Sequence, residues 1–212
     1  MNKNIGIIIK IVSAVIMIFI LINIQRFGLK VNSTIIHVYL FLVVSSLLSD
    51  RFFYSGQKSE NQVTSKNTSN ALAICWFSAI LIPIIEYSIY SREKLLVTII
   101  GITMVCTGTL FRGISIRTLG NFFSRDVEKW NNHRVIDSGV YKKIRHPAYL
   151  GNIVQVIGFP LVLNSYLCLT LSLITIVTFI WRIKVEEEFL KNEFPEYVCY
   201  TKRTNRLIPG IW

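Results

Sequence analysis

The stretch ALAICWFSAILIPIIEYSIYSREKLLVTIIGITMVCTGTLF, residues 71–111, decides the fold class of this chain. It holds two apolar runs, 71–89 and 95–111, separated by a short charged connector. A helix needs roughly 20 apolar residues to cross the hydrocarbon core of a bilayer, which is about 30 Å thick. Because each run has close to that length, we expect two membrane-crossing helices joined by a tight connection.

Further apolar runs lie on both sides of this stretch, at 5–24, 35–48, 148–163 and 166–181. The whole chain is 52% hydrophobic and only 17% charged, with a mean hydropathy of +0.49, whereas soluble domains carry about 25% charged residues. The last two runs are separated only by Asn164 and Ser165, which predicts a helical hairpin over 148–181. We therefore predict an all-α, polytopic membrane bundle with about six spans, or five if one arm of the hairpin does not cross fully.

Positive charge dominates the polar residues, with 23 Lys and Arg against 12 Asp and Glu and a formal net charge of +11. In membrane proteins Lys and Arg accumulate in cytoplasmic loops. With six spans and a cytoplasmic N-terminus, the opposite side would hold only Arg26, Lys30, Arg92 and Lys94. We therefore predict that both termini and the basic segment 112–147 face the cytoplasm, next to anionic membrane lipids. The charge needs no nucleic-acid partner to explain it.

The cysteines are spread along the chain as Cys75, Cys106, Cys168 and Cys199. The first three lie inside apolar runs, and none belongs to a closely spaced pair of the kind that is typical of structural zinc sites. We expect reduced thiols and no metal site.

The densest polar pattern precedes the hairpin and comprises Gly139, Tyr141, the triplet Arg145-His146-Pro147, Tyr149 and Gly151. Proline is favoured in the first turn of a helix, where the backbone N–H groups, together with Arg145 and His146, can hold an anionic ligand. The alternative is that the two basic residues only anchor the helix at the lipid headgroups. Because His, Tyr and cations converge at one membrane boundary, we interpret the pattern as functional.

Two further sets of residues can carry chemistry. Arg182 and Glu186 are four residues apart directly after the last apolar run, which puts them on one helix face. An exposed pair of this kind contributes at most about 1 kcal/mol, but a pair at the bilayer boundary is partly desolvated and more often functional. Arg112 ends the 95–111 run and either extends to the headgroups or binds an anionic substrate through two hydrogen bonds.

The order of these motifs resembles the isoprenylcysteine carboxyl methyltransferases, a family of membrane-embedded enzymes. The similar elements are Gly108-x-x-x-Arg112, His133 to Ile136, Gly139-x-Tyr141, Arg145-His146-Pro147-x-Tyr149-x-Gly151, Arg182-x-x-x-Glu186-Glu187, and Tyr200 followed by Arg206-x-x-Pro209. The first half is similar only in being apolar. We therefore divide the chain into N-terminal transmembrane spans, 1–107, and a methyltransferase region, 108–212, which contains the hairpin and an amphipathic C-terminal helix.

The resemblance implies S-adenosylmethionine as the methyl donor, in a pocket at the cytoplasmic face rather than in a separate nucleotide-binding domain. The residues that match the family's donor site are Glu128, His133, Arg134, Val135, Ile136, Tyr141, His146, Pro147, Ala148, Tyr149 and Glu186. The resemblance also places Arg112 and Arg182 on the substrate side and, with Glu186, in the catalytic set. The acceptor that it implies is a lipophilic carboxylate, either a prenylated cysteine or a small lipid-like metabolite.

Two other functions fit part of the sequence. Membrane sterol and enone reductases have segments similar to Arg145-His146-Pro147-x-Tyr149-x-Gly151 but bind NADPH. Their other motifs are expected in additional upstream spans, for which this chain is short, and the Arg182 and Glu186 arrangement fits the methyltransferases better. The second alternative is a binding protein that keeps the scaffold without activity, against which the presence of His146 and Glu186 argues. The sequence leaves the acceptor, the methylated atom and the oligomeric state open.

Overall fold

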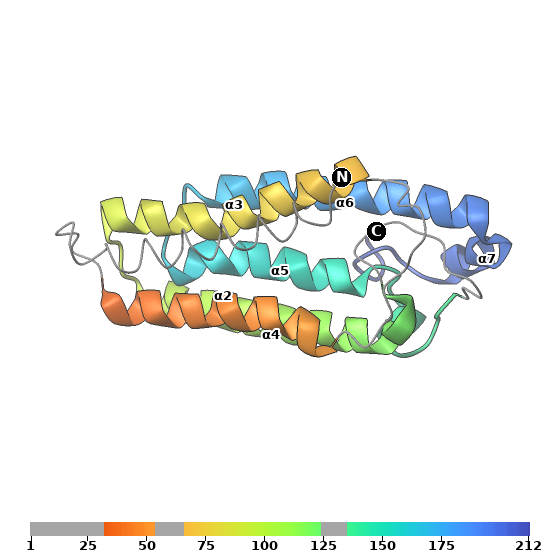
Figure 1. The fold of residues 1–212 in the computed structure, drawn as a ribbon, viewed down its shortest axis with the longest axis horizontal. Helices are drawn as coiled ribbons and strands as arrows, with labels where there is room; N and C mark the ends of the chain where they lie inside the picture. The colour runs from red at the N-terminus through yellow and green to blue at the C-terminus, as the bar shows by residue number, and fades with distance from the viewer. Residues whose placement is uncertain (1–31, 54–65, 124–134) are drawn as a thin grey trace.

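The computed structural model describes residues 32–53, 66–123 and 135–212, and within these ranges it contains helices and no β-strand. Five long helices, α2 to α6, run side by side along one axis, while the short α7 lies at one end of the bundle (Figure 1). The α-helices are α2 (Ser33–Phe53), α3 (Lys66–Tyr90), α4 (Leu95–Leu119), α5 (Pro147–Val162), α6 (Leu169–Glu193) and α7 (Pro195–Arg203). Two 3-10 helices, η1 (Gly120–Phe122) and η2 (Gly139–Lys142), lie between α4 and α5. The all-α prediction is confirmed for this part of the chain.

The apolar runs from residue 35 onward coincide with α2 to α6, whereas the run 5–24 lies outside the described residues. Two of these helices have the length and hydropathy of membrane spans, at Thr68–Tyr90 and Leu95–Leu119. The apolar parts of α2 and α5, Ser33–Ser49 and Pro147–Val162, are shorter. The number of spans therefore stays a prediction.

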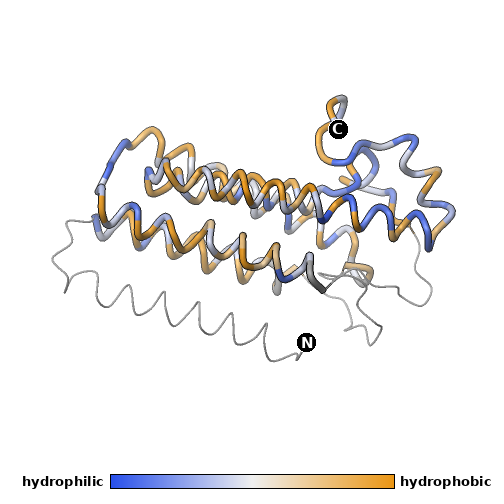
Figure 2. Tube along the Cα trace, turned by 90° about the horizontal axis from the view of Figure 1, so that it is seen from above, coloured by the Kyte–Doolittle hydropathy of each residue, from blue (hydrophilic) through white to orange (hydrophobic). Residues whose placement is uncertain are grey.

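Large apolar side chains cover much of the outer surface of the bundle. Phe41, Ile89, Leu95 and Leu173 are each more than 60% exposed. Polar residues gather at both ends of the bundle, more extensively at the end that carries α7 and the C-terminus, while the middle is mainly hydrophobic (Figure 2). A soluble protein rarely exposes so much contiguous apolar surface, whereas helices that face lipid do.

The helices α4 and α5 approach so closely that only glycine fits at their crossing. A Cβ atom on Gly108 would lie 2.6 Å from the carbonyl oxygen of Gly151, and one on Gly151 would lie 2.7 Å from that of Gly108. Gly101 and Gly158 form a second crossing of the same kind. Small residues at such crossings are typical of helix pairs in membranes, where packing and interhelical hydrogen bonds drive association. The first crossing places the beginning of α5 beside Arg112 of α4.

The turn between α5 and α6 is anchored on α4. Asn164 has a φ of 53°, a left-handed conformation that asparagine adopts more readily than most residues. Its side chain donates a hydrogen bond to the Thr98 hydroxyl at 2.8 Å and accepts one from the backbone N–H of Lys94 at 3.2 Å. The hairpin that the sequence predicts at this point therefore has a fixed position relative to α4.

Candidate functional site

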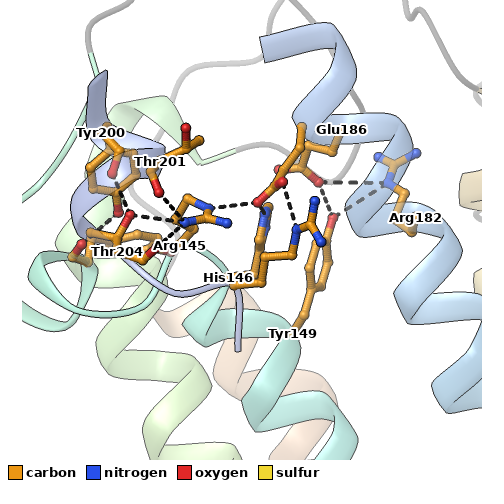
Figure 3. A network of polar contacts seen from close by, with 11 residues as sticks. Arg145, His146, Tyr149, Arg182, Glu186, Tyr200, Thr201 and Thr204 are labelled. Carbon is orange, nitrogen blue, oxygen red and sulfur yellow. Dashed lines mark hydrogen bonds and ion pairs between the residues drawn. The ribbon is translucent and has the colours of Figure 1, made fainter. Parts of the chain in front are cut away.

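The candidate site lies at the polar end of the bundle, where α5 begins and α6 extends beyond its apolar part (Figure 3). The first residue of α5 is Pro147, and His146 is its N-cap; proline suits this position because the N–H that it lacks would have no partner within the helix. The backbone N–H groups of Arg145 and His146 donate to the carbonyl oxygens of Asn205 and Arg206 at 2.8 and 3.0 Å. The C-terminal segment thus holds the start of α5 in place.

Glu187 of α6 is the centre of a buried ionic cluster. Its side chain is only 2% exposed. Arg145 Nε donates to Glu187 Oε1 at 2.7 Å, and Arg206 Nε donates to Oε2 at 2.9 Å. His146 Nε2 lies 3.3 Å from Oε1. The two basic residues that were expected to hold an anionic ligand at the start of α5, Arg145 and His146, therefore contact a carboxylate of the chain itself.

This environment holds the pKa of Glu187 well below its ordinary value. Burial alone would raise the pKa, because a low-dielectric surrounding disfavours the charged form. The hydrogen bonds from His146, Arg145 and Arg206 outweigh that effect. Glu187 is thus an ionised carboxylate at neutral pH, which can accept hydrogen bonds but cannot donate them.

Arg145 also ties α7 to the start of α5. Its Nη1 atom donates to the carbonyl oxygens of Thr201 and Thr204, the former at 3.2 Å, and to the Thr204 hydroxyl at 3.2 Å. The Arg145 side chain is 8% exposed. Its guanidinium therefore supports the local architecture instead of presenting a charge to solvent.

The neighbouring Glu186 belongs to a second and more accessible group of side chains (Figure 3). The Tyr149 hydroxyl donates to Glu186 Oε2 at 2.6 Å, and Arg182 Nε lies 4.0 Å from the same oxygen. His146 stacks on Tyr149, with 5.6 Å between the ring centroids and 15° between the ring planes. The Glu186 side chain is 26% exposed, whereas that of Arg182 is 1% exposed. Four of the residues selected from the sequence thus meet at one place.

Arg182 is held from its other side by α3. Its Nη1 atom donates to the hydroxyls of Thr68 at 2.5 Å and Ser69 at 3.1 Å. Both residues lie in the first turn of α3, in a region where the sequence shows no motif. The structure therefore excludes the exposed ion pair that was one interpretation of Arg182 and Glu186, because the guanidinium is buried between α3, α5 and α6.

Arg112, predicted to face the substrate, is buried in α4 with 9% of its surface exposed. Its Nη1 atom donates to the carbonyl oxygen of Ala148 at 3.4 Å, and its guanidinium lies 5.8 Å from the centroid of the Phe123 ring. This burial is not that of a headgroup anchor. Arg112 and Arg182 contact consecutive residues of α5, Ala148 and Tyr149, from α4 and α6 respectively.

Tyr141 lies in η2 and is 5% exposed. Its carbonyl oxygen accepts a hydrogen bond from the Tyr200 hydroxyl at 2.6 Å, which connects η2 to α7. Burial, followed by the negative charge of Glu186, raises the pKa of Tyr141 far above its ordinary value, and Arg112 opposes this change. Tyr141 is therefore a neutral phenol, whose hydroxyl can donate a hydrogen bond. It lies close enough to Glu186 and Arg112 for both charges to affect its pKa.

The other residues selected from the sequence divide into two groups. Pro147 and Ala148 are buried in the first turn of α5, and Ile136 is half-buried. Val135 packs against a buried cluster formed by Phe194, Tyr197 and Tyr200. Glu128, His133 and Arg134 lie outside the described residues.

Sequence reasoning missed the central position of Glu187 and the contribution of Thr68. A signal for Glu187 was present, because Phe179, Ile183 and Glu187 follow one another at intervals of four residues and so share one face of α6. Phe179 and Ile183 are both fully buried. No local pattern indicates the contact between Thr68 and Arg182, since it joins residues 114 positions apart.

Comparisons with known proteins agree on one family. Residues 100–192 match the sequence model described as the isoprenylcysteine carboxyl methyltransferase (ICMT) family. A protein-S-isoprenylcysteine O-methyltransferase of Saccharomyces cerevisiae is 34% identical over 151 residues, covering 68% of this chain and 62% of that protein. Protein-S-isoprenylcysteine O-methyltransferase B of Arabidopsis thaliana is 29% identical over 163 residues, covering 69% of this chain and 81% of that protein.

A solved structure of the "eukaryotic intramembrane Ras methyltransferase ICMT" is similar in fold, with a TM-score of 0.53 and 19% sequence identity. The similarity covers 100% of this chain and 88% of that one. The family match includes Arg112, Tyr149, Arg182 and Glu186, whereas α2 and α3 precede it. The chain spans 62% of the length of the yeast relative.

Proposed function

Because this chain belongs to the isoprenylcysteine carboxyl methyltransferase family, we propose that it is an integral membrane enzyme that transfers a methyl group from S-adenosylmethionine to a lipophilic carboxylate. The names of the relatives indicate an S-prenylated cysteine as the acceptor class. A small lipid-like metabolite with a free carboxylate is a second acceptor class for the same reaction. Since the chain covers less than two thirds of the yeast relative, the proposal rests on the site residues as much as on the relatives' names.

One observation carries the proposal: Tyr149, Arg182 and Glu186 meet at the start of α5. Their contact brings a partly exposed carboxylate, an aromatic ring and a buried guanidinium together at one end of an apolar bundle. Ionisable groups at the boundary of a membrane protein are costly to bury, and they are typical of functional sites. The family match supports the same interpretation, because all three residues lie inside the matched range.

The side chains present fit S-adenosylmethionine. Its sulfonium is a cation, which favours a nearby carboxylate and aromatic faces, and its ribose hydroxyls can donate to a carboxylate. Glu186 and the stacked rings of His146 and Tyr149 supply these groups. When bound, the cofactor would supply an electrophilic methyl group attached to a positively charged sulfur.

We assign donor binding to a set of residues around this carboxylate. Within the described part of the chain they are Val135, Ile136, Tyr141, His146, Pro147, Ala148, Tyr149 and Glu186. From the sequence alone, Glu128, His133 and Arg134 belong to the same set.

The residues on the acceptor side need only hold and orient the carboxylate. A carboxylic acid has a pKa near 4 and is ionised at neutral pH, so no general base is required. An arginine guanidinium can hold a carboxylate through two hydrogen bonds. Arg112 and Arg182 both contact the first turn of α5, beside the donor residues. We therefore assign to these two arginines the alignment of the acceptor, which is the main catalytic task when both reactants are bound.

The site faces the cytoplasm in this proposal, and the chain crosses the membrane several times. Lys142 lies in η2, which packs on α4, and Lys191 lies in the last turn of α6, whereas Arg92 and Lys94 precede the first residue of α4. The excess of basic residues at the site end favours its cytoplasmic orientation.

The NADPH-dependent reductase is not proposed. The matched family and the relatives named above are methyltransferases. Arg182 and Glu186, whose arrangement fits the methyltransferases better at the level of the sequence, lie 4.0 Å apart in the structure.

Methyl transfer is tested with the full chain in lipid nanodiscs, S-adenosylmethionine labelled on its methyl group, and an S-farnesylated cysteine derivative. We expect the label in a base-labile methyl ester, and none when the carboxylate of the acceptor is amidated. A membrane lipid extract serves as the second acceptor pool and is analysed by mass spectrometry. Transfer to neither acceptor would contradict the proposal, and label on the amidated derivative would contradict O-methylation.

A further inference from the structure

Glu187 has no role in the donor or acceptor assignments above, yet its surroundings are unusual. The carboxylate is nearly inaccessible, and both of its oxygens are engaged by donors from segments on either side of α6 in the sequence. Two of the contacts, to Arg145 and Arg206, clamp the start of α5 to the C-terminal segment. The third contact, to His146, leads directly to the ring that stacks on Tyr149.

The contact between Glu187 and His146 bears on which nitrogen of the imidazole carries a proton. An ionised carboxylate only accepts hydrogen bonds, so a hydrogen bond between Glu187 Oε1 and His146 Nε2 requires a proton on Nε2. In the neutral imidazole, Nδ1 is then the acceptor. The same hydrogen bond restricts rotation of the ring, which lies nearly parallel to the Tyr149 ring.

We propose that Glu187 is a positioning residue for the methyl-donor site: it keeps the proton of His146 on Nε2 and holds the imidazole stacked on Tyr149, whose hydroxyl binds Glu186. The donor's identity in this statement rests on the proposed function. The placement of a proton on Nε2 of His146 does not, because it is argued from the contacts within the chain.

If Glu187 were only a structural clamp, it would act through Arg145 and Arg206 alone. It would then not determine which ring nitrogen of His146 carries the proton. The two roles therefore differ in a spectroscopic property. The chain contains 3 histidines, His37, His133 and His146, so ¹⁵N-labelled histidine gives few signals, and His146→Gln identifies those of His146.

The first measurement uses the full wild-type chain in detergent, without cofactor. We expect the Nε2 signal of His146 to be that of a protonated nitrogen and, at a pH where the ring is neutral, the Nδ1 signal to be that of an unprotonated one. A neutral ring with its proton on Nδ1 overturns the proposal, whether or not any Glu187 variant folds.

The second measurement compares Glu187→Gln and Glu187→Asp with Glu188→Gln, which removes the neighbouring, exposed carboxylate. Losing a charge-assisted contact that orders a binding residue should reduce the affinity for S-adenosylhomocysteine about 10- to 100-fold in Glu187→Gln. Glu187→Asp keeps the charge and should recover part of the affinity, and Glu188→Gln should bind like the wild type. The ¹⁵N spectrum of Glu187→Gln should show a mixture of the two neutral forms of His146.

A Glu187→Gln variant that melts like the wild type, binds S-adenosylhomocysteine equally well and keeps the Nε2 proton contradicts the proposal. If the wild type itself fails to bind S-adenosylhomocysteine, the proposed function fails. The ¹⁵N spectra then still decide whether Glu187 controls His146.

Discussion

Glu186 of α6 and Arg112 of α4 both contact the first turn of α5, but at different residues. Glu186 accepts from Tyr149 and is 26% exposed, whereas Arg112 is buried against Ala148 and Phe123. Replacing Glu186 with Gln should weaken S-adenosylhomocysteine binding about tenfold, because a partly exposed charged hydrogen bond contributes about 1–2 kcal/mol. Arg112→Ala should bind the same ligand nearly as well as the wild type and lose methyl transfer. Calorimetry and the methyl-ester assay measure the two effects.

Exposed neighbours provide the matched controls for this pair. Glu188→Gln removes an exposed carboxylate two residues after Glu186 on α6, and Arg117→Ala removes an exposed arginine of α4. Both should bind and turn over like the wild type. If Glu186→Gln and Arg112→Ala are folded and retain full methyl transfer, the assignment of these two residues is wrong even though the family is right.

Glu187 should make the stability of the protein depend on pH. The groups that face it are Arg145, His146 and Arg206, and its folded-state pKa is lowered. The contribution of its charge to the free energy of unfolding is therefore present above the unfolded pKa of about 4.3 and is lost as the pH falls toward the folded value. Between pH 7 and pH 3 this loss should amount to about 1–2 kcal/mol.

Thermal unfolding in detergent at the two pH values measures this dependence. Glu187→Gln should be less stable at pH 7 and should lose less stability on acidification than the wild type, whereas Glu188→Gln should follow the wild type. Equal losses in all three proteins would show that Glu187 does not have a lowered pKa in the folded state.

Several residues that the sequence marks by type and spacing lie together in the structure, while their roles stay a prediction. His146, Tyr149, Arg182 and Glu186 were selected for their type and spacing, and the structure brings them into contact. Glu187 was not selected, because beside Glu186 and Glu188 it is one of three successive glutamates whose exposure depends on packing. Its partner Arg206 lies on a segment that reaches it only through the tertiary fold.

At the level of helices, the crossing of α4 and α5 controls the position of the site. Gly108→Ala should destabilise the protein by about 1–3 kcal/mol, because the added methyl group meets the Gly151 carbonyl oxygen, which belongs to the backbone. The shift should also displace Arg112 and reduce methyl transfer. Cys106→Val adds bulk at an exposed position of the same helix and should leave both properties unchanged. Thermal unfolding of Gly108→Ala that matches the wild type would contradict the packing described for this crossing.

The apolar runs predicted which segments are helical, but not where every helix ends. α4 continues from Phe111 to Leu119 because Arg112, Ser115 and Ile116 are buried, although the run of apolar residues stops at Phe111. α6 ends at Glu193 and α7 begins at Pro195, as expected of a proline that starts a new helix. A helix end set by a residue type, such as the proline that begins α7, can thus be predicted from the sequence. A helix end set by tertiary packing, such as that of α4, cannot.

For the whole molecule, the distribution of Lys and Arg predicts which end of the bundle faces the cytoplasm. Lys94 precedes α4 at one end, and Lys142 lies in η2 near the other end. In a background without native cysteines, Lys142→Cys should react with a thiol reagent only from the cytoplasmic side, and Lys94→Cys only from the opposite side. Both positions are exposed, so reagent access is not limited by packing. Reversed labelling would contradict the orientation and the proposed access of a cytosolic cofactor.

The site also depends on the half of the chain for which the sequence shows no motif. Thr68 and Ser69 of α3 hold Arg182, although the family match begins only at residue 100. The prediction of a separate catalytic region, 108–212, is not tested by the comparisons. These contacts show that α3 contributes polar partners for Arg182 as well as apolar packing.

The central claim is that the residues at the start of α5 and the polar end of α6 bind S-adenosylmethionine. Calorimetry of the purified wild-type chain with S-adenosylhomocysteine, and in parallel with NADPH, tests it most directly. We predict stoichiometric binding of S-adenosylhomocysteine, weakened by Glu186→Gln, and no binding of NADPH. Tight binding of NADPH with no response to S-adenosylhomocysteine would contradict the claim and favour the reductase function.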